Sequence, residues 1–208
     1  MSGTLYYVAD PMCSWCWGFH PVLMAVKEAL PKDREIVYVM GGLARDSDEA
    51  MNEETRAYVK NAWRGVAART GASFNWDFWE KCGPRRSTYP SCRSFYAAQV
   101  QDAGVAMFEA VQRAYYQEAR NPSDGQTLVA LAGEIGIDTD RFASDLASPE
   151  IEQQMQDGFN IRRPMNANQF PSLVFRDGEN VTFITKGYND VAPVLSGLDA
   201  VFGRLENV

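Results

Sequence analysis

The sequence predicts an α/β protein in which one β-sheet is interrupted by a long all-helical segment. Strand-like runs lie near the two ends of the chain, at residues 5–9, 35–40, 172–176 and 181–185, whereas residues 46–163 carry almost no strand signal. Short apolar, β-branched or aromatic runs bounded by turn residues are typical of strands, and apolar residues three and four apart are typical of helices. We therefore expect all four strands to form one sheet, with the helical segment inserted between its two halves.

The first half of the sheet is predicted from a strand–helix–strand unit. Residues 5–9 form an apolar and aromatic run that Asp10 and Pro11 interrupt, a helical pattern covers residues 13–30, and residues 35–40 are again strand-like. A helix between two such strands implies that the strands are parallel and joined by a right-handed crossover.

The second half is predicted from a β-hairpin and a last helix. The strand-like residues 172–176 and 181–185 flank the turn sequence Asp-Gly-Glu-Asn at 177–180, and the helix is expected at about residues 190–205. An Asp-Gly turn between two apolar runs is a strong short-range signal for a hairpin.

The middle of the chain predicts an inserted helical domain. Serine and aspartate residues stand where several of its helices begin, as N-capping residues do. We expect residues 1–45 and 164–208 to form one discontinuous domain, and residues 46–163 to form a second, all-helical domain. The helices expected in this insert cover residues 52–70, 74–81, 90–119, 124–135, 140–147 and 149–159.

The composition is that of an ordinary globular chain. Of the 208 residues, 46% are hydrophobic and 23% are charged, and the formal net charge is −7. An acidic chain without a basic stripe is a poor candidate for a nucleic-acid partner, and no run approaches the roughly 20 apolar residues of a membrane-spanning helix. The N-terminus lacks the features of a signal peptide, so the sequence predicts a cytoplasmic protein with neither nucleic-acid nor membrane partners.

Cys13 and Cys16 lie where the first strand meets the first predicted helix. Residues three apart in the first helical turn are close enough for their sulfurs to bond. Unpaired N–H groups at a helix start and the positive end of the helix dipole stabilise a thiolate on the first cysteine. We therefore predict that Cys13 is the nucleophile, which attacks a substrate disulfide, and that Cys16 then displaces the product from the mixed disulfide.

Other interpretations of the cysteines remain open. A Cys-x-x-Cys pair is also half of a zinc site, but nine residues separate Cys82 from Cys92, and His20 is the single histidine, so we predict no metal site. Two inert core cysteines are a further alternative for Cys13 and Cys16. Cys82 and Cys92 are predicted either as a second redox or structural pair or as two free thiols.

Pro171 is a second candidate element of the site. It follows Phe170 and directly precedes the third predicted strand. A proline can begin a strand but cannot occupy its middle. A cis Phe170–Pro171 bond would expose the Phe170 backbone for strand-like pairing with an extended substrate near Cys13, and an ordinary trans proline is the alternative.

Together these features resemble the DsbA family of the thioredoxin superfamily, and residues 10–19 resemble its cytoplasmic, FrnE-like branch. The resemblance covers the whole chain. It implies a thioredoxin fold with a large inserted all-helical domain, and the activity of a protein disulfide oxidoreductase or isomerase. It also implies that Cys13 and Cys16 are catalytic, that Phe170 and Pro171 form a substrate-binding loop, and that no cofactor is needed beyond the Cys13–Cys16 disulfide.

The sequence departs from the family pattern at two places. Ser14 and Trp15 stand between the cysteines, where the periplasmic enzymes carry a histidine that makes them strong oxidants, so that redox potential does not transfer. Tyr7 stands six residues before the first cysteine, where many members carry a buried acid that relays a proton, and Asp10 is near. We predict that Ser14 and Trp15 contact substrate, with Trp15 at the surface and Trp17 in the core.

The expected partners are protein or peptide disulfides, with glutathione as a candidate co-substrate that the Arg85–Arg86 pair would position. Kappa-class glutathione transferase-like or isomerase-like enzymes resemble this layout, but they typically carry serine in place of the nucleophilic cysteine and lack the second one. A thiol-based metal-binding or chaperone-like module is the alternative from another class. Catalysed insulin reduction would separate these hypotheses.

Overall fold

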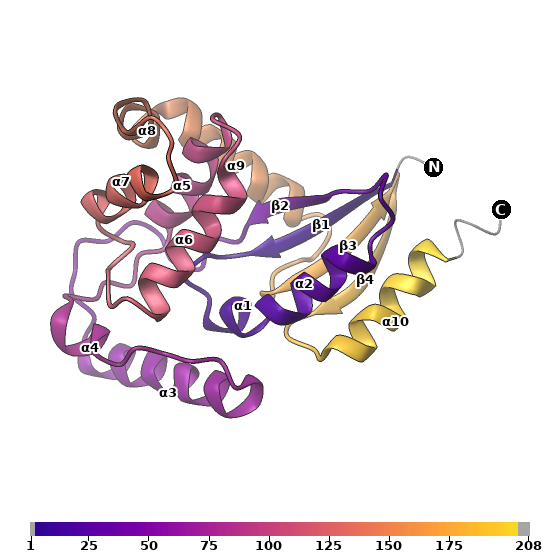
Figure 1. The fold of residues 1–208 in the computed structure, drawn as a ribbon, viewed down its shortest axis with the longest axis horizontal. Helices are drawn as coiled ribbons and strands as arrows, with labels where there is room; N and C mark the ends of the chain where they lie inside the picture. Colours follow the sequence, from indigo (N-terminus) through magenta and orange to yellow (C-terminus); the bar gives the residue numbers. More distant parts are fainter. Residues whose placement is uncertain (1–2, 204–208) are drawn as a thin grey trace.

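The computed structural model describes residues 3–203 and shows one sheet of four strands (Figure 1). The strands are β1 (Thr4–Ala9), β2 (Ile36–Met40), β3 (Ser172–Asp177) and β4 (Asn180–Lys186), and their order across the sheet is β2-β1-β3-β4. β1 pairs with β2 in parallel and with β3 antiparallel, and β3 and β4 form an antiparallel hairpin. The predicted single sheet is therefore confirmed.

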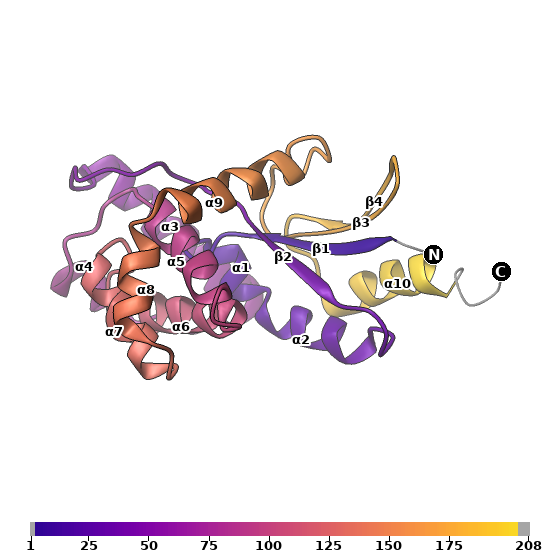
Figure 2. The ribbon, with the colours of Figure 1, turned by 90° about the horizontal axis from the view of Figure 1, so that it is seen from above.

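Helices cover both faces of this sheet (Figure 2). α1, α2 and α10 lie on one face, and α9 crosses the other. None of the helices within residues 3–203 is long and apolar enough to cross a membrane. The helices are α1 (Ser14–Gly18), α2 (His20–Ala29), α3 (Glu53–Thr70), α4 (Phe78–Lys81), α5 (Tyr89–Gln99), α6 (Gly104–Tyr116), α7 (Gly125–Glu134), α8 (Thr139–Leu146), α9 (Pro149–Arg162) and α10 (Val191–Phe202).

The alternation of side chains along β1 builds two cores. Leu5 and Tyr7 point into the larger core, which α2 and α10 complete. Val8 points to the opposite face and packs with Val39 and Val174 in a smaller core. Successive residues of a strand face opposite sides of a sheet, so one apolar strand can supply both.

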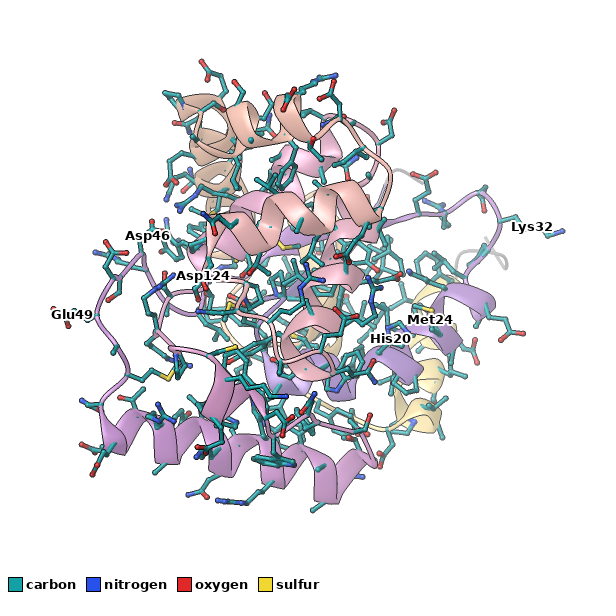
Figure 3. All side chains as sticks on the ribbon, turned by 60° about the vertical axis from the view of Figure 1, so that its left-hand side comes forward. His20, Met24, Lys32, Asp46, Glu49 and Asp124 are labelled. Atoms are coloured by element: carbon teal, nitrogen blue, oxygen red, sulfur yellow. The ribbon has the colours of Figure 1, made fainter. Side chains whose placement is uncertain are left out.

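Helices α3–α9 lie between β2 and β3, as predicted for the insert. The larger core continues into this helical block through side chains of α5, α6 and α9, including Phe95, Phe108 and Phe159. Arg93 of α5 binds Asp46 on the connection from β2 to α3 (Figure 3) and Glu152 of α9. The block is thus anchored to the sheet by shared apolar packing, and the ion pairs of Arg93 join α5 to α9 and to the connection after β2. The predicted domain boundaries at 45/46 and 163/164 stay predictions.

The predicted helix at residues 13–30 is wrong in one respect, because the structure divides it at Phe19 into α1 and α2. Pro21 lies in the first turn of α2 and has no N–H with which to continue the bonding pattern of α1.

The predicted helix at residues 90–119 is likewise two helices, α5 and α6, separated by residues 100–103. Asp102 takes a left-handed conformation with φ 59° in this turn. The turn lets the apolar faces of the two helices pack together, with Ala97, Ala98, Ala110 and Val111 fully buried between neighbours.

Two further helix ends differ from the sequence expectation. Only residues 78–81 of the predicted helix at 74–81 are helical. α10 ends at Phe202, and Leu205, the expected last residue of that helix, lies outside the described residues.

Asn52 caps α3, because its side chain accepts a hydrogen bond from the backbone N–H of Thr55 at 2.9 Å. We expect Asn52→Ala to lower the free energy of unfolding by about 1 kcal/mol, since the N–H group loses its partner. Asn61→Ala, in the exposed middle of α3, is the matched control and should change it by less than about 0.5 kcal/mol. Urea unfolding at neutral pH measures both, and equal effects would contradict the capping role.

Candidate active site

Cys13 lies at the junction that the sequence predicted, as the N-cap residue of α1. The turn before it is closed by Asp10, whose carbonyl accepts from the N–H of Cys13 at 3.0 Å and whose carboxylate accepts from the N–H of Met12 at 2.9 Å. Cys13 has an extended backbone, with φ −84° and ψ 114°, and the helix begins at the next residue. The backbone N–H groups of the first turn of α1 therefore follow Cys13 directly in the chain, as predicted for a cysteine at a helix start.

Cys16 lies one turn further into α1 and is almost fully buried, with 1% of its surface exposed against 7% for Cys13. Both side chains are free thiols. Burial raises the pKa of the Cys16 thiol well above its ordinary value, and the adjacent Cys13 acts in the same direction. Cys16 therefore keeps its proton at neutral pH, and Cys13 is the outer sulfur of the pair.

The loop before β3 faces Cys13. The Phe170–Pro171 peptide bond is cis, and the Sγ atom of Cys13 donates to the carbonyl of Phe170 at 3.7 Å. The ring of Phe170 lies so close to Gly41 that a Cβ atom there would meet it at 2.6 Å. Asn168 of the same loop accepts from Arg162 of α9 at 2.7 Å. The structure thus brings Phe170 and Pro171 to the dithiol, 157 residues away in sequence.

Two clefts open beside Cys13, separated by Trp15 and Phe170, which line both. The smaller cleft, about 190 Å³, contains Cys13 itself and is hereafter the Cys13 cleft. Its other lining residues include Ser14, Leu43, Tyr58, Arg86 and Asn168. The larger cleft, about 520 Å³, is lined by Arg69, Gln169, Gly187 and Tyr188. Ser14 and Trp15, the predicted contact residues, therefore lie on the open side of the dithiol.

The two tryptophans beside Cys16 differ less in burial than expected. Trp15 is half-buried and packs 5.5 Å from the ring of Tyr188. Trp17 is also half-buried, so its expected place in the core is only partly correct. The reason is that its indole N–H donates to the carbonyl of Ser73 at 3.0 Å while its ring stacks on Tyr116.

Asp10 is a fully buried carboxylate behind the dithiol. It accepts from Met12 in its own turn, from the N–H of Leu43 at 2.8 Å and from the hydroxyl of Thr88 at 2.8 Å, and the Sγ atom of Cys92 lies 3.5 Å away. Burial raises the pKa of Asp10, and the hydrogen bonds from Leu43, Thr88 and Met12 oppose this rise. One side chain thus joins the active-site turn to the loop after β2 and to α5.

From sequence, Asp10 is expected to interrupt the first strand and to lie near the position of a proton-relaying acid, but its partners are not predicted. Its partners Thr88 and Cys92 follow it by 78 and 82 residues, so no local pattern could reveal them. The available signal was the parallel pairing of β1 and β2, which places residues after Ala9 and after Met40 at one edge of the sheet.

Tyr7, six residues before Cys13 on β1, is fully buried. Burial raises the pKa of its hydroxyl well above the ordinary value, and the neighbouring Cys16 acts in the same direction. A neutral phenol therefore lies beside the buried thiol.

The structure does not bring Cys82 and Cys92 together as a pair. Both are free thiols. Cys82 donates to the carbonyl of Ala119 at 3.0 Å, whereas Cys92 is fully buried against Asp10. Within residues 3–203 no three His, Cys, Asp or Glu side chains are grouped so that they could hold a metal ion, so the tetrathiolate zinc alternative gains no geometric support.

A β2-β1-β3-β4 sheet with a dithiol at the start of the first helix, faced by a cis-proline loop, defines a thioredoxin-fold protein. The sequence matches the family described as Thioredoxin over residues 6–192, and the chain belongs to this family. The expected thioredoxin fold with a DsbA-like helical insert is confirmed.

Two solved structures are similar over nearly their whole length. One is a Nitrosomonas europaea protein provisionally described as a protein disulfide isomerase, with a TM-score of 0.83 and 28% identity, covering 98% of this chain and 99% of that one. The other is the cytosolic disulfide reductase DsbM from Pseudomonas aeruginosa, with a TM-score of 0.77 and 22% identity, covering 99% and 100%. DsbM has also been solved with GSH, and at this identity the likeness shows the fold alone.

One curated relative is named as an adapter protein and not as a disulfide isomerase or reductase. The ClpXP adapter protein SpxH of Bacillus subtilis is 26% identical over 175 residues, which cover 82% of this chain and 57% of that protein. The chain thus spans less than two thirds of the length of this relative.

Proposed function

We propose that the protein is a thiol–disulfide oxidoreductase that acts on protein or small-molecule disulfides through Cys13 and Cys16. The observation that carries this proposal is the placement of the two sulfurs: Cys13 caps α1 and faces the carbonyl of Phe170 at 3.7 Å, and Cys16 lies buried one turn behind it. The outer sulfur can reach a substrate while the inner one is kept from it.

The exchange proceeds in two steps with Cys13 as the attacking group. The Cys13 thiolate attacks one sulfur of the substrate disulfide, so that a mixed disulfide forms and the other substrate sulfur leaves as a thiolate that takes up a proton. Cys16 then loses its proton and attacks the Cys13 sulfur, which releases the second substrate thiol. The substrate gains two electrons, and the protein is left with a Cys13–Cys16 disulfide.

Extended substrates would lie along the loop before β3. The backbone of Phe170 lies two residues before β3 and next to Cys13, where it could pair with a peptide as an added strand. Trp15 and Ser14 would form the opposite wall of the substrate site. We infer that thiols such as glutathione re-reduce the pair, and that the protein works in the cytoplasm, where such thiols are abundant; the names of DsbM and its GSH complex support both inferences.

Insulin reduction by dithiothreitol tests the proposed function. Catalytic amounts of the protein should shorten the lag before the freed insulin chains precipitate, in proportion to protein concentration. A lag that equals that of dithiothreitol alone at every concentration would contradict the proposal.

The name of the curated relative favours one second candidate, an adapter that binds a protein partner without turnover. An adapter of this kind should bind its partner equally well when Cys13 and Cys16 are both serine. An oxidoreductase should instead lose its effect on disulfides in that variant.

A further inference from the structure

The adjacent residues Arg85 and Arg86 have different surroundings. Arg85 donates to the carbonyl of Ser123 at 2.9 Å and forms an ion pair with Asp124, the N-cap residue of α7 (Figure 3). Arg86 is exposed, and among the described residues its guanidinium has neither a hydrogen bond nor an ion pair. Arg85 therefore links the loop before α5 to the start of α7, whereas the guanidinium of Arg86 is available to a ligand.

Arg86 lines the Cys13 cleft and is its one charged side chain among the described lining residues. In this acidic chain, whose net charge is −7, Arg86 is one of several described arginines without a carboxylate partner, and among these it is the one that lines the Cys13 cleft. Many of its other arginines contact a carboxylate, namely Arg69, Arg85, Arg93, Arg113, Arg120 and Arg141. The guanidinium of Arg86, which has no carboxylate partner, and the sulfur of Cys13 therefore line the same cleft.

The size of the Cys13 cleft and its lining residues limit which anionic groups could bind beside Arg86. Its volume of about 190 Å³ is below the roughly 300–1,000 Å³ of pockets that enclose a whole drug-sized ligand, so the cleft would take one end of a substrate. Among the lining residues, Leu43 and Tyr58 are 39% and 66% exposed, and Asn168 supplies a further polar group. A guanidinium binds a carboxylate with two parallel hydrogen bonds, a geometry that lysine cannot reproduce.

We propose that Arg86 is an anion subsite of the Cys13 cleft, which binds a carboxylate of a small acidic peptide disulfide while Cys13 attacks its sulfur. The proposal rests on the proposed thiol–disulfide exchange and names the substrate class that the same site prefers. Arg86 binds the substrate and takes no part in the transfer of electrons or protons.

The test compares two disulfides that differ in charge. Reduced protein is mixed with glutathione disulfide, which carries carboxylates, or with hydroxyethyl disulfide, which is uncharged, and the second-order rate of loss of protein thiols is measured. We expect Arg86→Gln to lower the rate with glutathione disulfide about tenfold, as loss of a charge-assisted hydrogen bond does, and to leave the rate with hydroxyethyl disulfide unchanged. Arg86→Lys should restore part of the rate, and added salt should slow the wild type more than Arg86→Gln.

Arg176→Gln is the matched control, because it removes the same charge at the opposite end of the sheet, where Arg176 pairs with Thr4. It should leave both rates unchanged. An equal fall with the two disulfides in Arg86→Gln would show that Arg86 acts on Cys13 and would overturn the subsite. An unchanged rate with glutathione disulfide would overturn it as well. Failure of the wild type to react with either disulfide would instead contradict the proposed function, and the subsite with it.

Discussion

Cys13→Ser should lower the rate of reaction with a disulfide by about 10³-fold or more, the scale on which enzymes lose turnover with their nucleophile. A serine hydroxyl is not ionised at neutral pH, so it cannot replace the thiolate that attacks sulfur. The residual rate is measured by the loss of substrate disulfide under excess protein. Because serine is nearly the same size and shape as cysteine, the variant should fold like the wild type although Cys13 is buried.

Cys16→Ser should have a different effect, and this difference distinguishes the roles of the two sulfurs. Cys13 still attacks, but the buried group that resolves the mixed disulfide is gone, so the substrate should remain attached to Cys13. Intact-mass analysis after mixing with a peptide disulfide should show this adduct in Cys16→Ser and not in Cys13→Ser. Cys82→Ser, which removes a thiol that binds Ala119 away from the dithiol, should behave as the wild type does. An adduct that forms on Cys16 in Cys13→Ser would reverse the assignment.

Asp10→Ala should be the most destabilising single change near the site. It removes the acceptor of the buried N–H of Met12 and of the N–H of Leu43, and an unsatisfied buried donor costs about 1–3 kcal/mol. Part of that cost is returned because a carboxylate is no longer buried, so we expect a net loss of about 2–4 kcal/mol. Asp190→Ala removes a carboxylate from the exposed pair with Arg69 and should lower the stability far less, because water and salt screen an exposed ion pair. Equal urea midpoints for the two variants would contradict this account of Asp10.

The protonation of Asp10 also predicts a pH dependence of stability. Burial raises the folded-state pKa of Asp10 above the unfolded value of about 3.9, so the folded protein binds this proton more tightly. The tighter binding of this proton therefore stabilises the folded state fully below a pH of about 4. This stabilisation is lost as the pH rises through the raised folded-state pKa of Asp10. The unfolding free energy of the wild type should fall relative to that of Asp10→Asn as the pH rises over that window. A wild type that gains stability relative to Asp10→Asn over the same window would contradict the direction.

Much of the dithiol site could be predicted from sequence because its signals are local. The spacing of Cys13 and Cys16 at a strand–helix junction predicts a dithiol, and the place of Pro171 before a strand indicates a second element of the site. The Asp10 network and the difference between Arg85 and Arg86 could not be predicted, because both depend on contacts between segments more than 30 residues apart.

The helix boundaries were missed for a similar reason. The apolar periodicity of residues 90–119 continues through the turn at Asp102, and only the packing of α5 against α6 shows that the chain reverses there. The order of elements needed no such knowledge, since each strand was bounded by its own turn residues.

A redox titration with glutathione buffers, followed by alkylation and peptide mapping of all four cysteines, tests the central claim most directly. The account predicts that Cys13 and Cys16 are lost to alkylation together in one reversible two-electron transition, linked to each other, while Cys82 and Cys92 stay reactive once the protein is unfolded. A link between any other two cysteines, or a dithiol that never closes across the range of buffers, would contradict it.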